Sequence, residues 1–118
     1  MPRIQWRGNN FLQRLEPMEL WPVGTKCEDD PVRPEISERD RFLYGREVYA
    51  LYHYAICCIA YCDEVRKTVN QLKTMAGLDI AVFYTVWSYR KGSGSEIINL
   101  MLPYLQEKKP WIKRFVTL

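Results

Sequence analysis

Apolar residues in the second half of the chain first follow the short period of β-strands. The segments REVYALYHY (46–54) and AICCIAYC (55–62) are rich in β-branched, aromatic and small apolar residues, and the chain can reverse near residues 53–55. This pattern predicts a β-hairpin. The next run, LDIAVFYTVWSY (78–89), is almost unbroken in its apolar character, as expected of a strand that is covered on both faces.

Helical spacing replaces this pattern in the last third of the chain. Ile97, Met101 and Leu105 form a stripe, which predicts a helix that Pro103 kinks or loosens. The final segment, WIKRFVTL, has the composition of a closing strand. The expected order is therefore a hairpin, a central strand, a glycine-containing loop, a helix and a strand.

Two further helices are expected from weaker patterns. DEVRKTVNQLKTMAG (63–77) has Val65, Val69 and Leu72 at helical spacing, but its polar and β-branched residues favour only a short or partial helix. NNFLQRLEPMEL offers Asn10 as a helix cap and Pro17 as a helix terminator. Apart from this helix, the proline-rich residues 1–45 are expected to be irregular with short helical pieces.

Length and composition add limits to this picture. A chain of 118 residues with 47% hydrophobic content can bury one core, so we expect a single domain over 1–118, with an N-terminal region (1–45) and a core (46–118). No run of about 18 apolar residues and no leader pattern occur, which favours the cytoplasm and no membrane partner. The net charge of +3 is mild, so nucleic acid is not the expected partner.

Metal binding is not expected. The four cysteines, Cys27, Cys57, Cys58 and Cys62, do not have the spacing of zinc ligands, and the chain has one histidine, His53. Strand alternation predicts that Cys58 and Cys62 share one face while Cys57 lies on the other. Buried free thiols of this kind pack as small apolar groups.

Candidate chemistry is concentrated in TVWSYRKGSGSEII, where Gly92 and Gly94 follow Arg90 and Lys91. Glycines allow bare backbone N–H groups to approach a phosphate, and a helix N-terminus favours an anion. The alternative is structural, because residues 93 and 96 have the S-x-x-E spacing of a capping box and need no ligand. The loop matches neither the P-loop nor the dinucleotide fingerprint.

The segment from Arg46 to Leu118 resembles the central part of the Gcn5-related N-acetyltransferase (GNAT) family. In that family the loop after the fourth strand follows (Q/R)-x-x-G-x-(G/A), and its amides hold the pyrophosphate of acetyl-CoA. Residues 89–94, YRKGSG, match both small positions; Tyr89 departs from Gln or Arg, and Arg90 stands one residue later. The resemblance implies an α/β (α+β) fold with a GNAT-like mixed sheet and a phosphate-binding loop, incomplete at the C-terminus.

The resemblance also implies roles for individual residues. Amides of residues 90–95 would hold the pyrophosphate of acetyl-CoA or another acyl-CoA, and the backbone of residues 86–88 would pair with the pantetheine arm. Lys91, or the basic cluster of Lys108, Lys109, Lys113 and Arg114, would meet the nucleotide phosphate, unless that cluster is only a solvated helix end. The implied cofactor-binding residues are Val86, Trp87, Ser88, Arg90, Lys91, Gly92, Ser93, Gly94 and Ser95. No catalytic base or acid is assigned.

The implied function is an acyl-CoA-dependent N-acyltransferase, or a truncated relative of one, that acts on a small-molecule or protein amine. The alternative is a non-catalytic GNAT-fold module in a larger assembly. The resemblance predicts a further helix and strands after the last residue, so we expect a homo-oligomer or an assembly partner to cover the apolar final strand. A third hypothesis is nucleic-acid binding through YRKG and EKKPWIKR.

Overall fold

The computed structural model describes residues 12–43, 45–62 and 79–118. Within them the strands are β1 (Leu12–Arg14), β2 (Arg46–Leu51), β3 (Ala55–Cys62), β4 (Ile80–Ser88) and β5 (Arg114–Thr117). The helices are α2 (Glu38–Arg41) and α4 (Ser93–Lys108), with two 3₁₀ turns at Pro22–Gly24 and Cys27–Asp29. This confirms the α/β (α+β) class; the helix expected over 63–77 lies outside the described residues.

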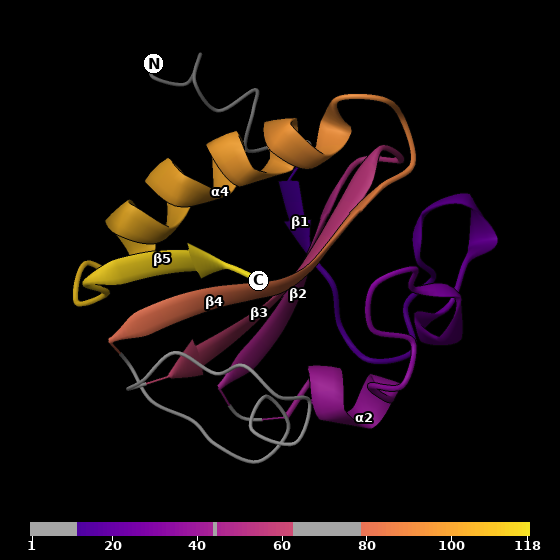
Figure 1. Ribbon diagram of the computed structural model, residues 1–118, viewed down its shortest axis with the longest axis horizontal. Helices are drawn as coiled ribbons and strands as arrows, with labels where there is room; N and C mark the ends of the chain where they lie inside the picture. Colours follow the sequence, from indigo (N-terminus) through magenta and orange to yellow (C-terminus); the bar gives the residue numbers. More distant parts are fainter. Residues whose placement is uncertain (1–11, 44, 63–78) are drawn as a thin grey trace.

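The five strands form one mixed sheet in the order β1-β2-β3-β4-β5 (Figure 1). The first four strands are antiparallel neighbours, and β5 lies parallel to β4. The predicted hairpin, the central strand, the helix and the closing strand are therefore confirmed, and α4 continues through Pro103 to Lys108. A parallel neighbour requires a crossover connection, which α4 supplies.

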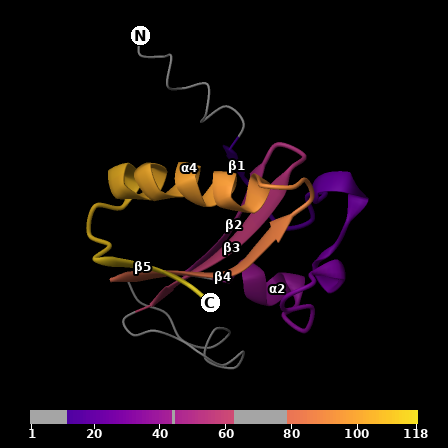
Figure 2. The same cartoon turned by 45° about the horizontal axis from the view of Figure 1, so that its top comes forward.

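Other elements lie on both faces of the sheet, as Figure 2 shows, and every residue of β2 and β3 is buried. On one face Ile97, Met101 and Leu105 of α4 pack against Phe83 and Ile59. The N-terminal region, including α2, covers the opposite face. There the core contains Leu15, Trp21, Ile36, Val48, Ile56, Val82 and Tyr84. Double coverage explains the nearly unbroken apolar run of β4.

The N-terminal helix predicted from NNFLQRLEPMEL is wrong within the described residues. Leu12–Arg14 forms β1, an edge strand in which Leu12 is paired with Leu51 and Arg14 with Tyr49. Leu15 continues this connection, because its backbone N–H donates to the Val48 carbonyl at 2.8 Å. Pairing with a distant strand therefore overrides the local helical spacing.

A buried ion pair attaches the N-terminal region to the sheet. The Arg41 guanidinium donates to Asp30 Oδ2 at 2.8 Å, and both side chains are 0% exposed. Asp30 Oδ2 also accepts from Thr85 Oγ1 of β4 at 2.9 Å. Arg41 makes further bonds to the carbonyls of Ile36 and Arg33. These contacts satisfy both charges, as burial demands.

A β-bulge in β4 brings Thr85 to this network. Cys58 is paired with Thr85 but its neighbour Ile59 is paired with Phe83, so Tyr84 is the extra residue on β4. The bulge places Tyr84 and Thr85 on the same face, where Tyr84 enters the core and Thr85 reaches Asp30. Strand alternation without a bulge would direct Thr85 toward α4.

Candidate functional site

The nine residues predicted to bind a cofactor lie together where β4 passes into α4. Val86–Ser88 end β4, Arg90–Gly92 form the connecting turn, and Ser93–Ser95 form the first turn of α4. Figure 1 shows this connection, in orange, at the end of α4 that is distant from β5. We call residues 89–95 the glycine loop. The prediction that these residues share one place is consistent with this geometry, whereas their binding role stays a prediction.

The glycine loop presents several free backbone N–H groups. Gly92 has φ 84° and ψ −10°, a left-handed conformation that favours glycine, and α4 begins directly after it. Among the described residues, the backbone N–H groups of Lys91, Gly92, Gly94 and Ser95 have no hydrogen-bond partner. A left-handed residue before a helix, with amides unpaired on both sides of it, produces a concave group of donors suited to an anion.

Gly94 matters for a different reason, namely close packing of α4 on β4. A Cβ atom added at Gly94 would lie 3.5 Å from Val86 Cγ1 and 3.6 Å from the Ser88 Cβ atom. These are ordinary contact distances, so alanine fits there but a branched side chain would press on β4. The first turn of the helix therefore lies directly against the last residues of the strand.

Ser93 fixes the loop to the sheet and does not cap the helix. Its hydroxyl is buried and lies within 2.8 Å of three oxygens: the carbonyl oxygens of Tyr54 and Arg90, and Ser88 Oγ. Gly92 is the N-cap residue, and no side chain caps the first turn. The alternative capping box is wrong, because the Ser93 hydroxyl is already bonded to the Tyr54 carbonyl, just before β3, and to Ser88 at the end of β4.

Positive charge at the loop comes from two exposed residues. The Arg90 guanidinium lies 3.5 Å from the centre of the Tyr54 ring and 3.9 Å from the Glu96 carboxylate. Stacking on Tyr54 keeps Arg90 beside the loop. Lys91 is exposed next to the free amides. Both side chains are placed to attract an anion.

The second basic cluster lies elsewhere. Lys108 ends α4, and a helix of 16 residues is about 24 Å long. Lys109, Lys113 and Arg114 follow Lys108 and so lie at the far end of the helix. The basic cluster is therefore about one helix length from the glycine loop, and its contact with the nucleotide phosphate stays a prediction.

Trp87 and Tyr89 pack between β4 and the N-terminal region. Their rings are stacked at 4.6 Å, and Trp21 contacts Trp87 edge-on at 6.3 Å. The Tyr89 hydroxyl lies 2.6 Å from Thr25 Oγ1, and burial raises the pKa of Tyr89 to about 12. Trp21 and Thr25 thus border the site without any local sequence signal, because they are more than 60 residues away from their partners.

Near the glycine loop, the edge of β4 that faces β5 has no strand partner in the part of the chain that the structure describes. β5 is paired with Ile80–Phe83 only, and Leu118 donates to the Phe83 carbonyl. Residues 86–88 are paired with β3 on the other side and have no strand partner on this side among the described residues. The backbone groups of residues 86–88 on this edge are therefore continuous with the free amides of the glycine loop.

The described residues contain neither a reactive cysteine nor a cluster of metal ligands. Burial raises the pKa of Cys27 to about 11 and that of Cys58 to about 12, so both thiols stay protonated at neutral pH. All four cysteines are free and buried, and Cys57 lies on the face opposite Cys58 and Cys62, as predicted. No group of three His, Cys, Asp or Glu side chains suited to a metal occurs in the part of the chain described.

The fold defines a small α+β protein with a five-stranded mixed sheet, in which a glycine-containing connection joins β4 to α4. No family model matches the chain, and no curated protein matches it by sequence. The chain is similar in structure to malonyl-CoA decarboxylase from Agrobacterium vitis, with a TM-score of 0.64 and 19% identity, covering 97% of this chain and 34% of that one.

Two further solved structures agree with this comparison. Malonyl-CoA decarboxylase from Cupriavidus metallidurans gives a TM-score of 0.60 at 20% identity, and that from Rhodopseudomonas palustris gives 0.59 at 19%. Each match covers 97% of this chain and 32% of the other. The chain thus spans about a third of the length of these proteins, and the similarity shows the fold alone.

These comparisons overturn the assignment to the GNAT family. No family model supports it, and the similar solved structures are malonyl-CoA decarboxylases. The predicted acyl transfer to an amine and the description as an acetyltransferase are wrong for the same reason. Glycine spacing before a helix produces an anion-binding loop in many proteins, so it does not identify one family.

The described residues were also compared with the length and hydropathy that a membrane-spanning helix requires. None of their helices is both long enough and apolar enough to cross a bilayer.

Proposed function

We propose that this protein binds a coenzyme A thioester, with the diphosphate held by the glycine loop. The observation that carries the proposal is the group of unpaired N–H groups of Lys91, Gly92, Gly94 and Ser95 at the start of α4. A diphosphate accepts several such bonds at once and is further favoured by the partial positive charge of the helix end. Acetyl-CoA and malonyl-CoA are the ligands to test.

The open edge of β4 supports the same ligand. The pantetheine arm contains amide groups that can pair with an extended backbone, and residues 86–88 are without a strand partner on the β5 side within the described residues. An arm lying there would run from the loop toward the bulge at Tyr84. Three malonyl-CoA decarboxylases of similar fold provide independent support for a CoA thioester rather than another diphosphate.

The proposal covers binding and assigns no reaction. The only histidine, His53, lies exposed on the turn between β2 and β3, and the described cysteines are all buried. No described side chain is thus identified as a nucleophile or base for decarboxylation.

Calorimetric titration with CoA, malonyl-CoA, acetyl-CoA, pantetheine and adenine tests the proposal. We expect saturable binding of the three CoA compounds that weakens with salt, little binding of pantetheine, which lacks the diphosphate, and none of adenine. Absence of saturable heat at millimolar CoA compounds overturns it.

Gly92→Ala tests whether the loop is responsible. A Cβ atom at Gly92 meets nothing within 4 Å, so the change acts only through its φ of +84°, at about 1–2 kcal/mol. If that strain displaces the turn, binding should weaken about tenfold or more. Gly24→Ala is a matched control, because Gly24 has φ +68°, is equally open and lies in the N-terminal region. Equal binding by Gly92→Ala and the wild type would locate the ligand elsewhere.

A further inference from the structure

Three large apolar side chains are displayed on one short segment of the N-terminal region. Met18, Leu20 and Val23 are 85%, 86% and 73% exposed. We call these three residues the apolar ridge. Single exposed apolar residues are common, but three of them within six positions form a patch of the kind used for contacts between proteins.

The backbone of the apolar ridge is fixed by an unusual conformation and by contacts with the rest of the N-terminal region. Met18 has φ 75° and Val23 has φ 59°, conformations that non-glycine residues rarely adopt. The Met18 backbone N–H donates to Glu38 Oε2 at 2.9 Å, and between the ridge residues Trp21 is buried at 4% exposure. Backbone strain of this kind persists only where surrounding contacts impose it, and such strain collects at functional surfaces.

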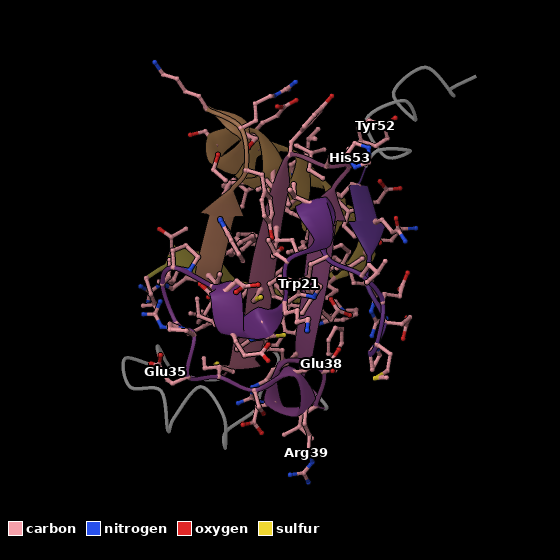
Figure 3. All side chains as sticks on the ribbon, turned by 90° about the vertical axis from the view of Figure 1, so that its right-hand side faces the viewer. Trp21, Glu35, Glu38, Arg39, Tyr52 and His53 are labelled. Carbon is pink, nitrogen blue, oxygen red and sulfur yellow. The ribbon has the colours of Figure 1, made fainter. Side chains whose placement is uncertain are left out.

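Two hollows flank the ridge, on the side of the molecule that faces the viewer in Figure 3, where Trp21 is labelled near the centre. One has a volume of about 410 Å³ and extends toward Cys27, Ile36 and Glu38. The other has a volume of about 510 Å³ and extends toward Ala50 and the turn at Tyr52–His53. Both volumes lie in the range of pockets that hold drug-sized ligands, so an indole ring fits either one.

Charge distinguishes this surface from the opposite end of the molecule. Residues 16–41 contain eight acidic and four basic residues, a formal net charge of −4. Residues 107–114 contain four basic residues and one acidic residue, a net charge of +3. Trp111 lies within this basic segment and is 49% exposed, with the Lys109 ammonium 5.8 Å from its ring. We call residues 107–114 the basic segment.

The two surfaces cannot meet within one molecule. Figure 1 shows the connection between α4 and β5 at one end of the horizontal long axis and the N-terminal region at the other. The molecule extends 42 Å along that axis. An acidic apolar surface and a basic segment with an exposed indole are complementary in both charge and polarity, so their contact must come from different copies.

We propose that a second copy of this chain docks here, with Trp111 of one copy in a hollow beside the apolar ridge of the next. Burial of the indole and of Leu20 supplies the apolar contact, and Lys108 and Lys113 face the surrounding carboxylates. The contact joins two different surfaces, so it is heterologous and can repeat from copy to copy. The average mass of the particles therefore rises with protein concentration and falls with salt.

Light scattering on the full chain, across a dilution series at low and high salt, tests this arrangement. The variants Leu20→Asp and Trp111→Ala should each remain single copies, because each removes one of the two surfaces. Their side chains are exposed, so circular dichroism should remain native. Leu118→Asp is the control, because Leu118 is an exposed leucine outside both surfaces and its variant should associate like the wild type.

Mixing the two variants provides the sharpest test. The Trp111→Ala copy retains the ridge and the Leu20→Asp copy retains the indole, so an equimolar mixture should form pairs and nothing larger. The proposal is overturned by a single-copy mass at every concentration, by a mixture that stays unpaired, or by a dimer that survives Trp111→Ala. The last result would mean that the copies associate without Trp111.

Discussion

At the scale of single residues, the buried Asp30–Arg41 ion pair makes the stability of the protein depend on pH. Burial would raise the pKa of Asp30, but hydrogen bonds from the Val32 backbone, Arg41 and the Arg33 backbone outweigh it and hold that pKa below its ordinary value. The folded state therefore favours the ionised carboxylate. The resulting stabilisation is complete above the ordinary aspartate pKa of about 4 and is lost as the pH falls through the lower, folded-state pKa.

Asp30→Asn should accordingly lower the free energy of unfolding at neutral pH by about 3–5 kcal/mol, since it leaves the buried Arg41 charge unpaired. Chemical denaturation followed at several pH values measures the change. The variant should also show a flatter loss of stability below about pH 4. Glu96→Gln is the control, because the Arg90–Glu96 pair is exposed and should contribute less than about 1 kcal/mol. A similar effect of both variants would contradict this account.

At the scale of elements, β4 contains one buried polar group without a partner in the described part of the chain, at its extra residue Tyr84. Its hydroxyl is buried and has no hydrogen-bond partner among the described residues. Tyr84→Phe should therefore leave the free energy of unfolding unchanged or raise it by about 1 kcal/mol. Thermal denaturation measures this directly.

Tyr61→Phe provides the comparison for that prediction. Tyr61 is a core tyrosine whose hydroxyl donates to Glu47 Oε1 at 2.6 Å, so its loss should lower stability by about 1.5–3 kcal/mol. A destabilised Tyr84→Phe would mean that the Tyr84 hydroxyl has a partner after all.

Elements with strong local patterns were predictable from the sequence. The hairpin, β4 and α4 follow from β-branched runs, an unbroken apolar stretch and a helical stripe. β1 was misassigned because the spacing of Leu12 and Leu15 also fits a helix, and only pairing with β2 decides between the two. The grouping of residues 86–95 was predictable because they are close in sequence.

The features of the fold and the site that the sequence did not predict depend on contacts between residues that are distant along the chain. The capping box was misread because Ser93 bonds to Tyr54, 39 positions earlier. The fold alone brings Thr25 beside Tyr89 and Asp30 beside Thr85. No local sequence pattern predicts these two contacts.

At the scale of the whole molecule, we propose that the N-terminal region and the sheet form one domain. Three contacts join them: Asp30 with Thr85, Thr25 with Tyr89, and Trp21 with Trp87. We expect one cooperative unfolding transition, with circular dichroism and tryptophan fluorescence changing together. A calorimetric enthalpy well above the van't Hoff value, or two separate transitions, would show that the regions unfold independently.

The parallel position of β5 also determines the expected order of folding. β2 and β3 are joined by residues 52–54 alone, whereas β4 and β5 meet only after the whole of residues 89–113 has crossed the sheet. Closing the longer connection costs more chain entropy before any contact compensates for it. Ile56→Val in β3 should slow refolding, while Val116→Ala in β5 should mainly speed unfolding, and stopped-flow measurements of both rates would reveal that order.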